Sequence, residues 1–276
     1  MMNIAIISST KDPASVNIKE VLLESYEFVK IENKFENNDV YGYLIDNKDI
    51  KLYTIDSELI FTDDLDKEID ADVFIFLSKH KAADGRASLT CHPIGNFGNN
   101  EKGGKENTLC TCPSSLLKEI LVELTKNVQE TEYEATLEAT HHGPFMEKPL
   151  LFFELGSTEK HWNDENGAKI YVKTLMNVLQ NENKSYESVF VIGGSHYSHV
   201  GNKTMLKSDF TVGHILPKHN FENLDENMLK QAMERIIPKP KFVLLDWKGL
   251  GKEKQRILEL LEKNDIEYKR SDMFFD

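Results

Sequence analysis

Short, wholly apolar segments alternate along this chain with segments of helical periodicity, and this alternation limits the folds that it can adopt. The clearest apolar segments are 73–77 (VFIFL) and 189–192 (VFVI), which are typical of strands buried on both faces of a parallel sheet. Helical periodicity follows in 113–124, 163–179 and 225–236. We therefore expect an α/β domain of three layers, with helices on both faces of a largely parallel sheet.

The two ends of the chain fit the same architecture. Ile4–Ser8 reads as a first strand, and Asp12 followed by Pro13 is typical of a helix start. The segment 241–269 reads as strand, helix and short strand. Weak strands near 41–54 and 133–155 suggest antiparallel additions, which would make the sheet mixed. Because we find no repeat and no linker, we expect one domain over 1–276.

The segment 79–112 breaks this pattern, since it shows no periodicity and holds five glycines. A structureless loop of this length inside a compact domain is uncommon and is usually functional or disordered. We expect it to carry part of a site.

Composition limits the partners and the compartment. The net charge of −13 argues against a broad nucleic-acid-binding face, so DNA is not expected and any contact with RNA must be local. Three cysteines give no disulfide framework, which favours a reducing cytoplasm. No apolar run approaches the roughly eighteen residues of a membrane span, and we see no signal peptide at the N-terminus.

The histidines gather in five segments at or near the predicted ends of strands. Imidazole ligates metals and titrates near neutrality, and strand-end loops are where open α/β sheets carry their chemistry. One composite site is therefore the simplest interpretation, and an enzyme is the first hypothesis. The segments are 78–98, 140–145, 154–162, 193–201 and 214–219.

For three of these segments, local structure limits or offers an alternative to a role in the site. His196 and His199 would converge if their segment is helical, but a polar turn with a capping histidine is the alternative. His141 and His142 follow a predicted strand and would point to opposite faces, so we expect at most one of them in the site. Glu154 with His161 suits zinc, although His161 could instead cap the helix that follows.

Several familiar motifs are absent from the sequence. It contains no H-E-x-x-H, no C-x-x-C, no G-x-S-x-G, no phosphate-binding P-loop and no G-x-G-x-x-G. Zinc fingers, acyl-serine hydrolases, NTPases and dinucleotide enzymes in their usual forms are therefore disfavoured. Hydrolysis by an activated water is the simplest chemistry that remains.

Taken together and in order, these segments resemble the archaeal and plant type of D-aminoacyl-tRNA deacylase. The resemblance rests on DPAS (12–15), LSKHKAADGRASLTCHPIGNFG (77–98), EATHHGPF (138–145), ELGSTEKHW (154–162) and IGGSHYSHVG (192–201). It implies hydrolysis of the ester between a D-amino acid, such as D-tyrosine, and the 3′ end of tRNA, as quality control of mischarged tRNA. It also implies a phosphorylase/hydrolase-like fold, and zinc with two ions possible.

On this basis we assign expected roles to twelve residues. Acid–base catalysis is expected from His80, His142, His196 and His199, and metal binding from His92, Glu154 and His161. Contacts with the CCA end of the tRNA are expected from Lys79, Arg86, Phe97, Ser195 and Tyr197. A monomer or small homo-oligomer is expected.

Two rival hypotheses stay open at this point. One is a metal-dependent exopeptidase or amidohydrolase acting on a small amide, which would need neither Lys79 nor Arg86. The other is a non-catalytic module that binds the 3′ end of tRNA and uses its histidines only for hydrogen bonds.

Overall fold

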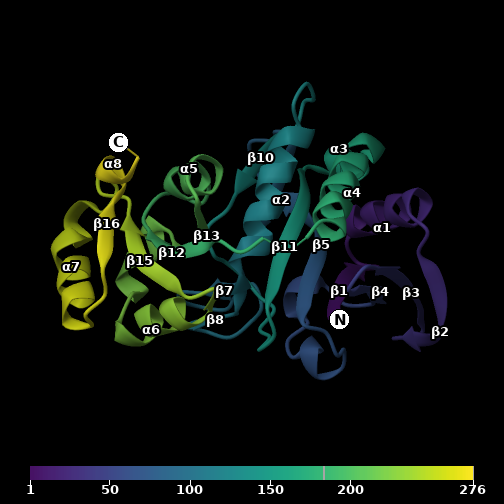
Figure 1. Cartoon of the computed structure of the whole chain (residues 1–276), viewed down its shortest axis with the longest axis horizontal. Coiled ribbons are helices and arrows are strands. Elements are labelled where there is room, and N and C mark those ends of the chain that lie inside the picture. Colours follow the sequence, from purple (N-terminus) through teal and green to yellow (C-terminus); the bar gives the residue numbers. More distant parts are fainter. Residues whose placement is uncertain (183, 276) are drawn as a thin grey trace.

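The computed structural model describes residues 1–182 and 184–275, and two sheets lie side by side in it (Figure 1). The larger sheet has eight strands in the order β10-β6-β11-β5-β1-β4-β3-β2. β1 pairs in parallel with β4 and β5, and β5 with β11, while β6 runs antiparallel to β11. The bounds are β1 Met2–Ser9, β2 Val29–Phe35, β3 Asn38–Ile45, β4 Lys48–Ile55, β5 Val73–Lys81, β6 Ser88–His92, β10 Glu134–Leu137 and β11 Leu150–Ser157.

The smaller sheet is entirely parallel, in the order β13-β12-β15-β16. Its strands are β12 Glu187–Ile192, β13 Phe210–Leu216, β15 Pro240–Leu245 and β16 Tyr268–Arg270. The mixed, largely parallel α/β architecture expected from the sequence is confirmed. Two two-stranded pairs complete the strands, β7 Gly95–Asn96 with β8 Thr108–Leu109 and β9 Cys112–Pro113 with β14 Ile236–Ile237.

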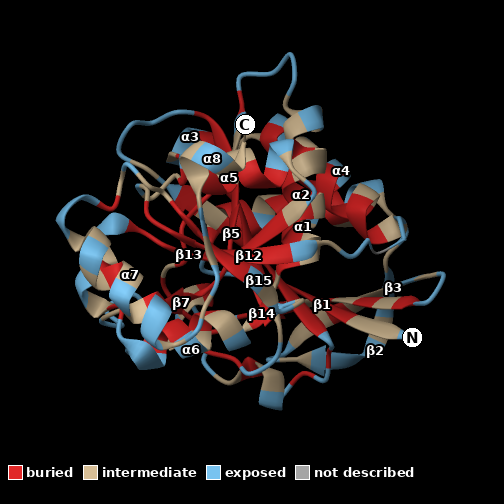
Figure 2. Ribbon diagram, turned by 60° about the vertical axis from the view of Figure 1, so that its left-hand side comes forward, coloured by how far each residue is buried: buried red, intermediate tan, exposed pale blue. Residues whose placement is uncertain are grey.

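Helices cover one face of both sheets, and the opposite face is covered differently over each sheet (Figures 1 and 2). The shared helical layer consists of α1 Pro13–Ser25, α2 Ser114–Asn127, α3 Glu159–Trp162, α4 Glu165–Gln180 and α5 His199–Lys207. On the opposite side, the small sheet packs against α6 Glu226–Glu234 and α7 Lys254–Lys263. Over the large sheet that face is closed by the short 3₁₀ turns Leu59–Phe61 and Leu65–Lys67 and by loops. The chain ends with α8 Ser271–Phe274.

The hydrophobic core runs without a break from one sheet to the other. Alternate residues of β12 face opposite sides, as strand geometry requires. Val189 and Val191 belong to the same core cluster as Ile6 of β1, whereas Phe190 and Ile192 face α6 and α7. This continuity agrees with the expected single domain, which stays a prediction.

The segment 79–112 differs from its prediction. It is not structureless, because residues 88–92 form β6, a fully buried strand between β10 and β11. The sequence SLTCH hid this strand, since it lacks the apolar run expected of a buried strand. β2 was also missed, because it is an edge strand with no buried residue.

The first helix begins as predicted, and its start reaches the end of β5. One Asp12 side-chain oxygen accepts a hydrogen bond from Ser15 N at 3.0 Å, which caps α1 at its N-terminus. The other oxygen accepts one from Lys79 N, also at 3.0 Å.

No helix in the described residues is both long and apolar enough to cross a membrane.

Candidate active site

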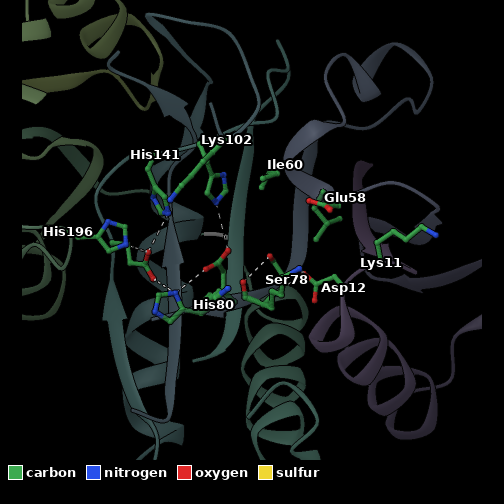
Figure 3. Close-up of a pocket in the computed structure, with 15 residues that line it drawn as sticks. Lys11, Asp12, Glu58, Ile60, Ser78, His80, Lys102, His141 and His196 are labelled. Atoms are coloured by element: carbon green, nitrogen blue, oxygen red, sulfur yellow. Dashed lines mark hydrogen bonds and ion pairs between the residues drawn. The ribbon is translucent and has the colours of Figure 1, made fainter. Parts of the chain in front are cut away.

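The candidate site lies where β5, β6, β10 and β11 meet the loop that follows β12. β5 contributes His80, β11 contributes Glu154 and β6 ends on His92. Glu138 follows the end of β10, and His196 lies on the loop after β12. Figure 3 shows His80, His141 and His196 turned toward one another at one end of a cavity. Segments far apart in the sequence are thus brought to one place.

Two buried carboxylates form the centre of this cluster. Glu138 is 0% and Glu154 is 4% exposed. The Glu138 oxygens lie 3.0 Å from His80 Nδ1 and 2.7 Å from His196 Nε2. Burial alone would raise the pKa of Glu138, but the facing His196 and His80 hold this pKa well below its usual range. Glu154 is affected in the same way by His142, His80 and His92, so both groups are carboxylate anions.

His80 bridges the two carboxylates. Its Nδ1 lies 3.0 Å from Glu138 and 3.3 Å from Glu154, and its Nε2 lies 2.9 Å from the hydroxyl of Tyr197. Burial would lower the pKa of His80, but the two carboxylates outweigh this effect and raise the pKa to about 11. His80 is therefore an imidazolium between two anions, which gives it no free lone pair for catalysis as a base. Trp162 fixes the strand end, because its Nε1 donates to His80 O at 2.7 Å.

Three further histidines bring ring nitrogens close together in the same space. In His92, His141 and His142 the Nδ1–H group donates to a backbone carbonyl, at 3.2, 2.8 and 2.6 Å respectively. The Nε2 atom is therefore the nitrogen of each ring that is left to face the site. Burial lowers the pKa of His141 and of His142, which favours their neutral forms, whereas in His92 the facing Glu154 outweighs burial and raises the pKa. The three Nε2 atoms lie 3.6 to 3.9 Å from a carboxylate oxygen, which is too long for a hydrogen bond.

This arrangement fits a metal ion. Side-chain nitrogens of His92, His141 and His142 lie within 4.8 Å of one another, and the buried His92 Nε2 has no hydrogen-bond partner among the described residues. A carbonyl that holds Nδ1–H is the usual support for a metal-binding histidine. Glu138 with His141 and His196 forms a second group of the same kind, and His80 with Glu138 and Glu154 a third.

The expectation that His141 and His142 cannot both face the site is wrong. It assumed extended backbone, but β10 ends at Leu137 and His142 adopts a left-handed conformation with φ +47°. The alternation of strand side chains does not apply to such a turn, and the two rings lie 4.4 Å apart. Both histidines therefore belong to the cluster.

Glycines allow this turn to pack closely against the 98–107 loop. A Cβ atom at Gly143 would lie 2.2 Å from Gly104 N and 2.6 Å from Ile60 O. Gly143 N donates to Lys102 O at 3.0 Å, so the loop is tied directly to the histidine pair. Only glycine at position 143 permits this approach of three backbone segments.

Several residues expected in the site lie outside the cluster. His161 lies within α3, where its Nδ1 accepts from Ser157 N at 3.2 Å. The helix that follows is capped by Asp164, so the alternative that His161 caps it is wrong. His199 is exposed at the first residue of α5. Phe97 is 1% exposed in the core beside Phe190, and Arg86 is held by Asp84 and Glu134 at 2.8 and 2.7 Å.

The other expected tRNA-binding residues lie at or beside the cluster. Tyr197 contacts His80, and Ser195 is exposed on the same loop. Lys79 lines the cavity and lies 3.5 Å from Asp12. Sequence reasoning missed Glu138, although the residue opens the quoted segment EATHHGPF. An acidic residue three positions before a histidine pair, at the end of a strand, was the available signal.

Two cavities meet at the cluster, and His141, His142, His196 and Lys102 line both of them. We call the smaller one, of about 230 Å³, the lysine cavity, because its wall includes Lys11, Lys79, Lys81 and Lys102. We call the other, of about 600 Å³, the asparagine cavity, because its wall includes Asn96, Asn99, Asn107, Asn220 and Asn223. A substrate with two unlike ends could therefore place its reacting bond between them.

Known proteins resemble this chain over nearly its whole length. A family model described as D-aminoacyl-tRNA deacylase matches residues 67–269. Proteins named D-aminoacyl-tRNA deacylase from Pyrococcus furiosus and Methanococcus vannielii are 34% and 33% identical, covering 95% and 98% of this chain and 98% and 100% of their own. A crystal structure of a conserved protein of unknown function superimposes with a TM-score of 0.86 at 29% identity, covering 98% of this chain and 95% of that one. The chain belongs to the D-aminoacyl-tRNA deacylase family.

Proposed function

We propose that this chain hydrolyses the ester of D-aminoacyl-tRNA, releasing the D-amino acid and free tRNA, and that the cluster around Glu138 and Glu154 is its active site. Family membership supports the reaction. The observation that supports the site is the convergence of three imidazole nitrogens and two buried carboxylates where two cavities meet.

The site would hold a zinc ion on His92, His141 and His142, with Glu154 beside them. Neutral imidazole and carboxylate are ordinary zinc ligands, at about 2.0–2.2 Å from the ion. Ligand atoms around such an ion lie roughly 3.4 Å apart, so nitrogens within 4.8 Å of one another need only a small closure. Bound there, zinc would acidify water and polarise the ester carbonyl. A second ion would have to use Glu138 and His196, because His141 Nδ1 is bound to Ala139 O and its Nε2 can serve only one ion.

His196 and Glu138 would move the proton. His196 Nε2 lies 2.7 Å from a Glu138 oxygen, and a proton on Nε2 facing this anion would leave Nδ1 free to take a proton from the attacking water. The same imidazole can then give that proton to the departing ribose oxygen. His196 is the more exposed partner of the pair, with its side chain 39% exposed against 0% for Glu138, so water and substrate can reach it.

The two ends of the substrate would occupy the two cavities, with the ester between them. The asparagine cavity suits the aminoacyl group, because Glu101, Glu106 and Glu222 on its wall favour the α-ammonium and disfavour phosphate. Its size would accept bulky and small side chains alike. We expect Asn220→Trp, which narrows this cavity, to slow deacylation of D-tyrosyl-tRNA more than that of D-alanyl-tRNA. Equal slowing of both substrates would contradict this placement.

The test of the function is direct. The protein is incubated with D-tyrosyl-tRNA and with L-tyrosyl-tRNA, each with and without a chelator. We expect rapid loss of the D-ester alone, and loss of that activity after chelation with recovery on added Zn²⁺. Equal hydrolysis of both esters, or none, would contradict the deacylase. Binding of tRNA without turnover would favour the non-catalytic module, and cleavage of small amides would favour the exopeptidase. Since the substrate is a tRNA used in translation, we also propose a cytoplasmic location.

A further inference from the structure

Three lysines on the rim of the lysine cavity have no acidic partner among residues 1–182 and 184–275. Lys11, Lys81 and Lys102 are exposed and line this cavity, and none of them forms an ion pair within the part of the chain that the structure describes. Lys79, which lies between them in sequence and lines the same cavity, differs because Asp12 is 3.5 Å away. Unpaired ammonium groups are available to a ligand at no cost in broken ion pairs.

The backbone of each of these lysines is fixed, although the side-chain ends are free. Lys11 N donates to Ser9 Oγ at 3.0 Å, and Lys81 is the last residue of β5. Lys102 O accepts the hydrogen bond from Gly143 N, which sets Lys102 beside the histidine pair. In Figure 3, Lys102 lies next to His141, and Lys11 lies at the far end of the cavity beyond Asp12. The three cations therefore border a path that leads to the cluster.

The charges around this path favour an anion. Four carboxylates line the lysine cavity. Asp12 accepts hydrogen bonds from backbone N–H groups of α1 and β5, and Glu138 and Glu154 face histidines. Glu58 is the exception, as an exposed carboxylate without an ion pair among the described residues. A chain of net charge −13 repels RNA over most of its surface, so a local group of free lysines is where phosphate can approach.

We propose that Lys11, Lys81 and Lys102 bind the last phosphodiesters of the single-stranded 3′ end of tRNA and lead its terminal ribose to the cluster. This inference rests on the proposed function. The contacts are to phosphate only, so they fix the position of the strand without reading its bases. Arg86, the expected phosphate ligand, takes no part, because Asp84 and Glu134 already neutralise it.

The test measures KM for D-tyrosyl-tRNA over a series of salt concentrations. Each phosphate contact to a single strand contributes a slope of about 0.7 in a plot of log affinity against log salt. We expect Lys11→Ala, Lys81→Ala and Lys102→Ala each to raise KM several-fold at low salt and to reduce the slope by roughly that amount. The matched control is Lys173→Ala, which removes an exposed lysine of α4 that also lacks an ion pair among the described residues. Its slope should equal that of the wild type.

A second substrate separates this inference from the function on which it rests. D-tyrosyl-adenosine carries the same ester but no phosphodiester, so the triple lysine variant should lose far more activity on D-tyrosyl-tRNA than on this ester. If wild-type protein hydrolyses neither substrate, the proposed function fails. If it hydrolyses the tRNA ester while the triple variant keeps the wild-type slope, or loses both activities equally, only the lysine path is overturned. A reduced slope in Arg86→Ala with none in the lysine variants would also overturn it.

Discussion

At the scale of single residues, Glu138 and His196 form a pair in which each side chain has a distinct task. The carboxylate is fully buried and ionised, and the imidazole is partly exposed and reaches the substrate side. An orienting carboxylate fixes the histidine tautomer and stabilises the imidazolium that forms during proton transfer. In the proposed mechanism, Glu138 is thus a positioning residue, and His196 is the group that touches the reacting water.

This division of roles predicts non-additive losses. We expect Glu138→Gln and His196→Gln each to lower kcat by about 10²-fold or more, with little change in KM. Because both changes disable one unit, the double variant should be no slower than about the worse single variant. Single-turnover deacylation rates measure all three. Glu134→Gln, which changes an exposed carboxylate that contacts Arg86, serves as the control. Losses that multiply in the double variant would contradict the pairing.

The three histidines with free Nε2 atoms predict a second result at this scale, in metal content. Replacing His92, His141 or His142 by alanine should lower the zinc bound per chain, because each removes one nitrogen from a set of three. Elemental analysis of protein purified without added metal measures this directly. For comparison, His199→Ala removes an exposed histidine outside the cluster and should leave zinc content unchanged. Full zinc content in all three cluster variants would exclude this ligand set.

At the scale of elements, the turn after β10 depends on a support from β13. His214 on β13 is 0% exposed, its Nε2–H donates to Cys110 O at 2.9 Å, and its Nδ1 accepts from Thr140 Oγ1 at 3.1 Å. The same Thr140 oxygen accepts from Ile215 N at 2.9 Å. The neutral ring thus ties the small sheet to the residue that precedes His141. Protonation would leave Nδ1–H facing a hydroxyl that already serves as an acceptor.

Burial lowers the pKa of His214 to about 4, and this shift predicts a pH-dependent stability. Between about pH 6.5 and pH 4 the unfolded chain holds a proton here that the folded chain lacks, so acidification favours unfolding. The contribution of the neutral His214 to the free energy of unfolding is present in full above pH 6.5. About 2 kcal/mol of this contribution should be lost by about pH 5.

The measurement compares free energies of unfolding in urea near neutral pH and near pH 5, for wild type and for His214→Gln. Because glutamine does not titrate, the variant should lose less stability on acidification, by about the same 2 kcal/mol. Parallel losses in both proteins would assign the acid sensitivity to other groups.

At the scale of the whole molecule, the sequence predicted those features that local patterns encode. The buried strands at 73–77 and 189–192 and the capped start of α1 follow from periodicity and from capping residues. It could not predict that Glu138 faces His80 and His196, since that contact depends on how β5, β10 and the β12 loop come together. Nor could it predict the left-handed His142, whose conformation reverses the expected direction of a side chain.

The same reasoning applies to the roles of single residues. His161 and Arg86 stand in segments that do reach the site, yet their side chains are held by local partners, Ser157 and Asp84 among them. Membership of a motif therefore located the segment correctly without locating the side chain. The unpaired Lys11, Lys81 and Lys102 became visible only once the ion pairs of the other lysines were known.

The continuity of the core predicts how the molecule unfolds. Because one core cluster contains residues of β1 and of β12, neither sheet can lose its packing without exposing apolar surface of the other. Each sheet has a tryptophan that can report on it. The Trp162 side chain donates to His80 O at the end of β5 in the large sheet. Trp247 comes two residues after β15 of the small sheet and packs against Arg270 at 4.2 Å. Each of the variants Trp162→Phe and Trp247→Phe keeps one tryptophan as its reporter. In each variant we expect the fluorescence transition in urea to coincide with the loss of helical circular dichroism. An early transition of Trp247 alone would instead divide the chain into two independently unfolding units.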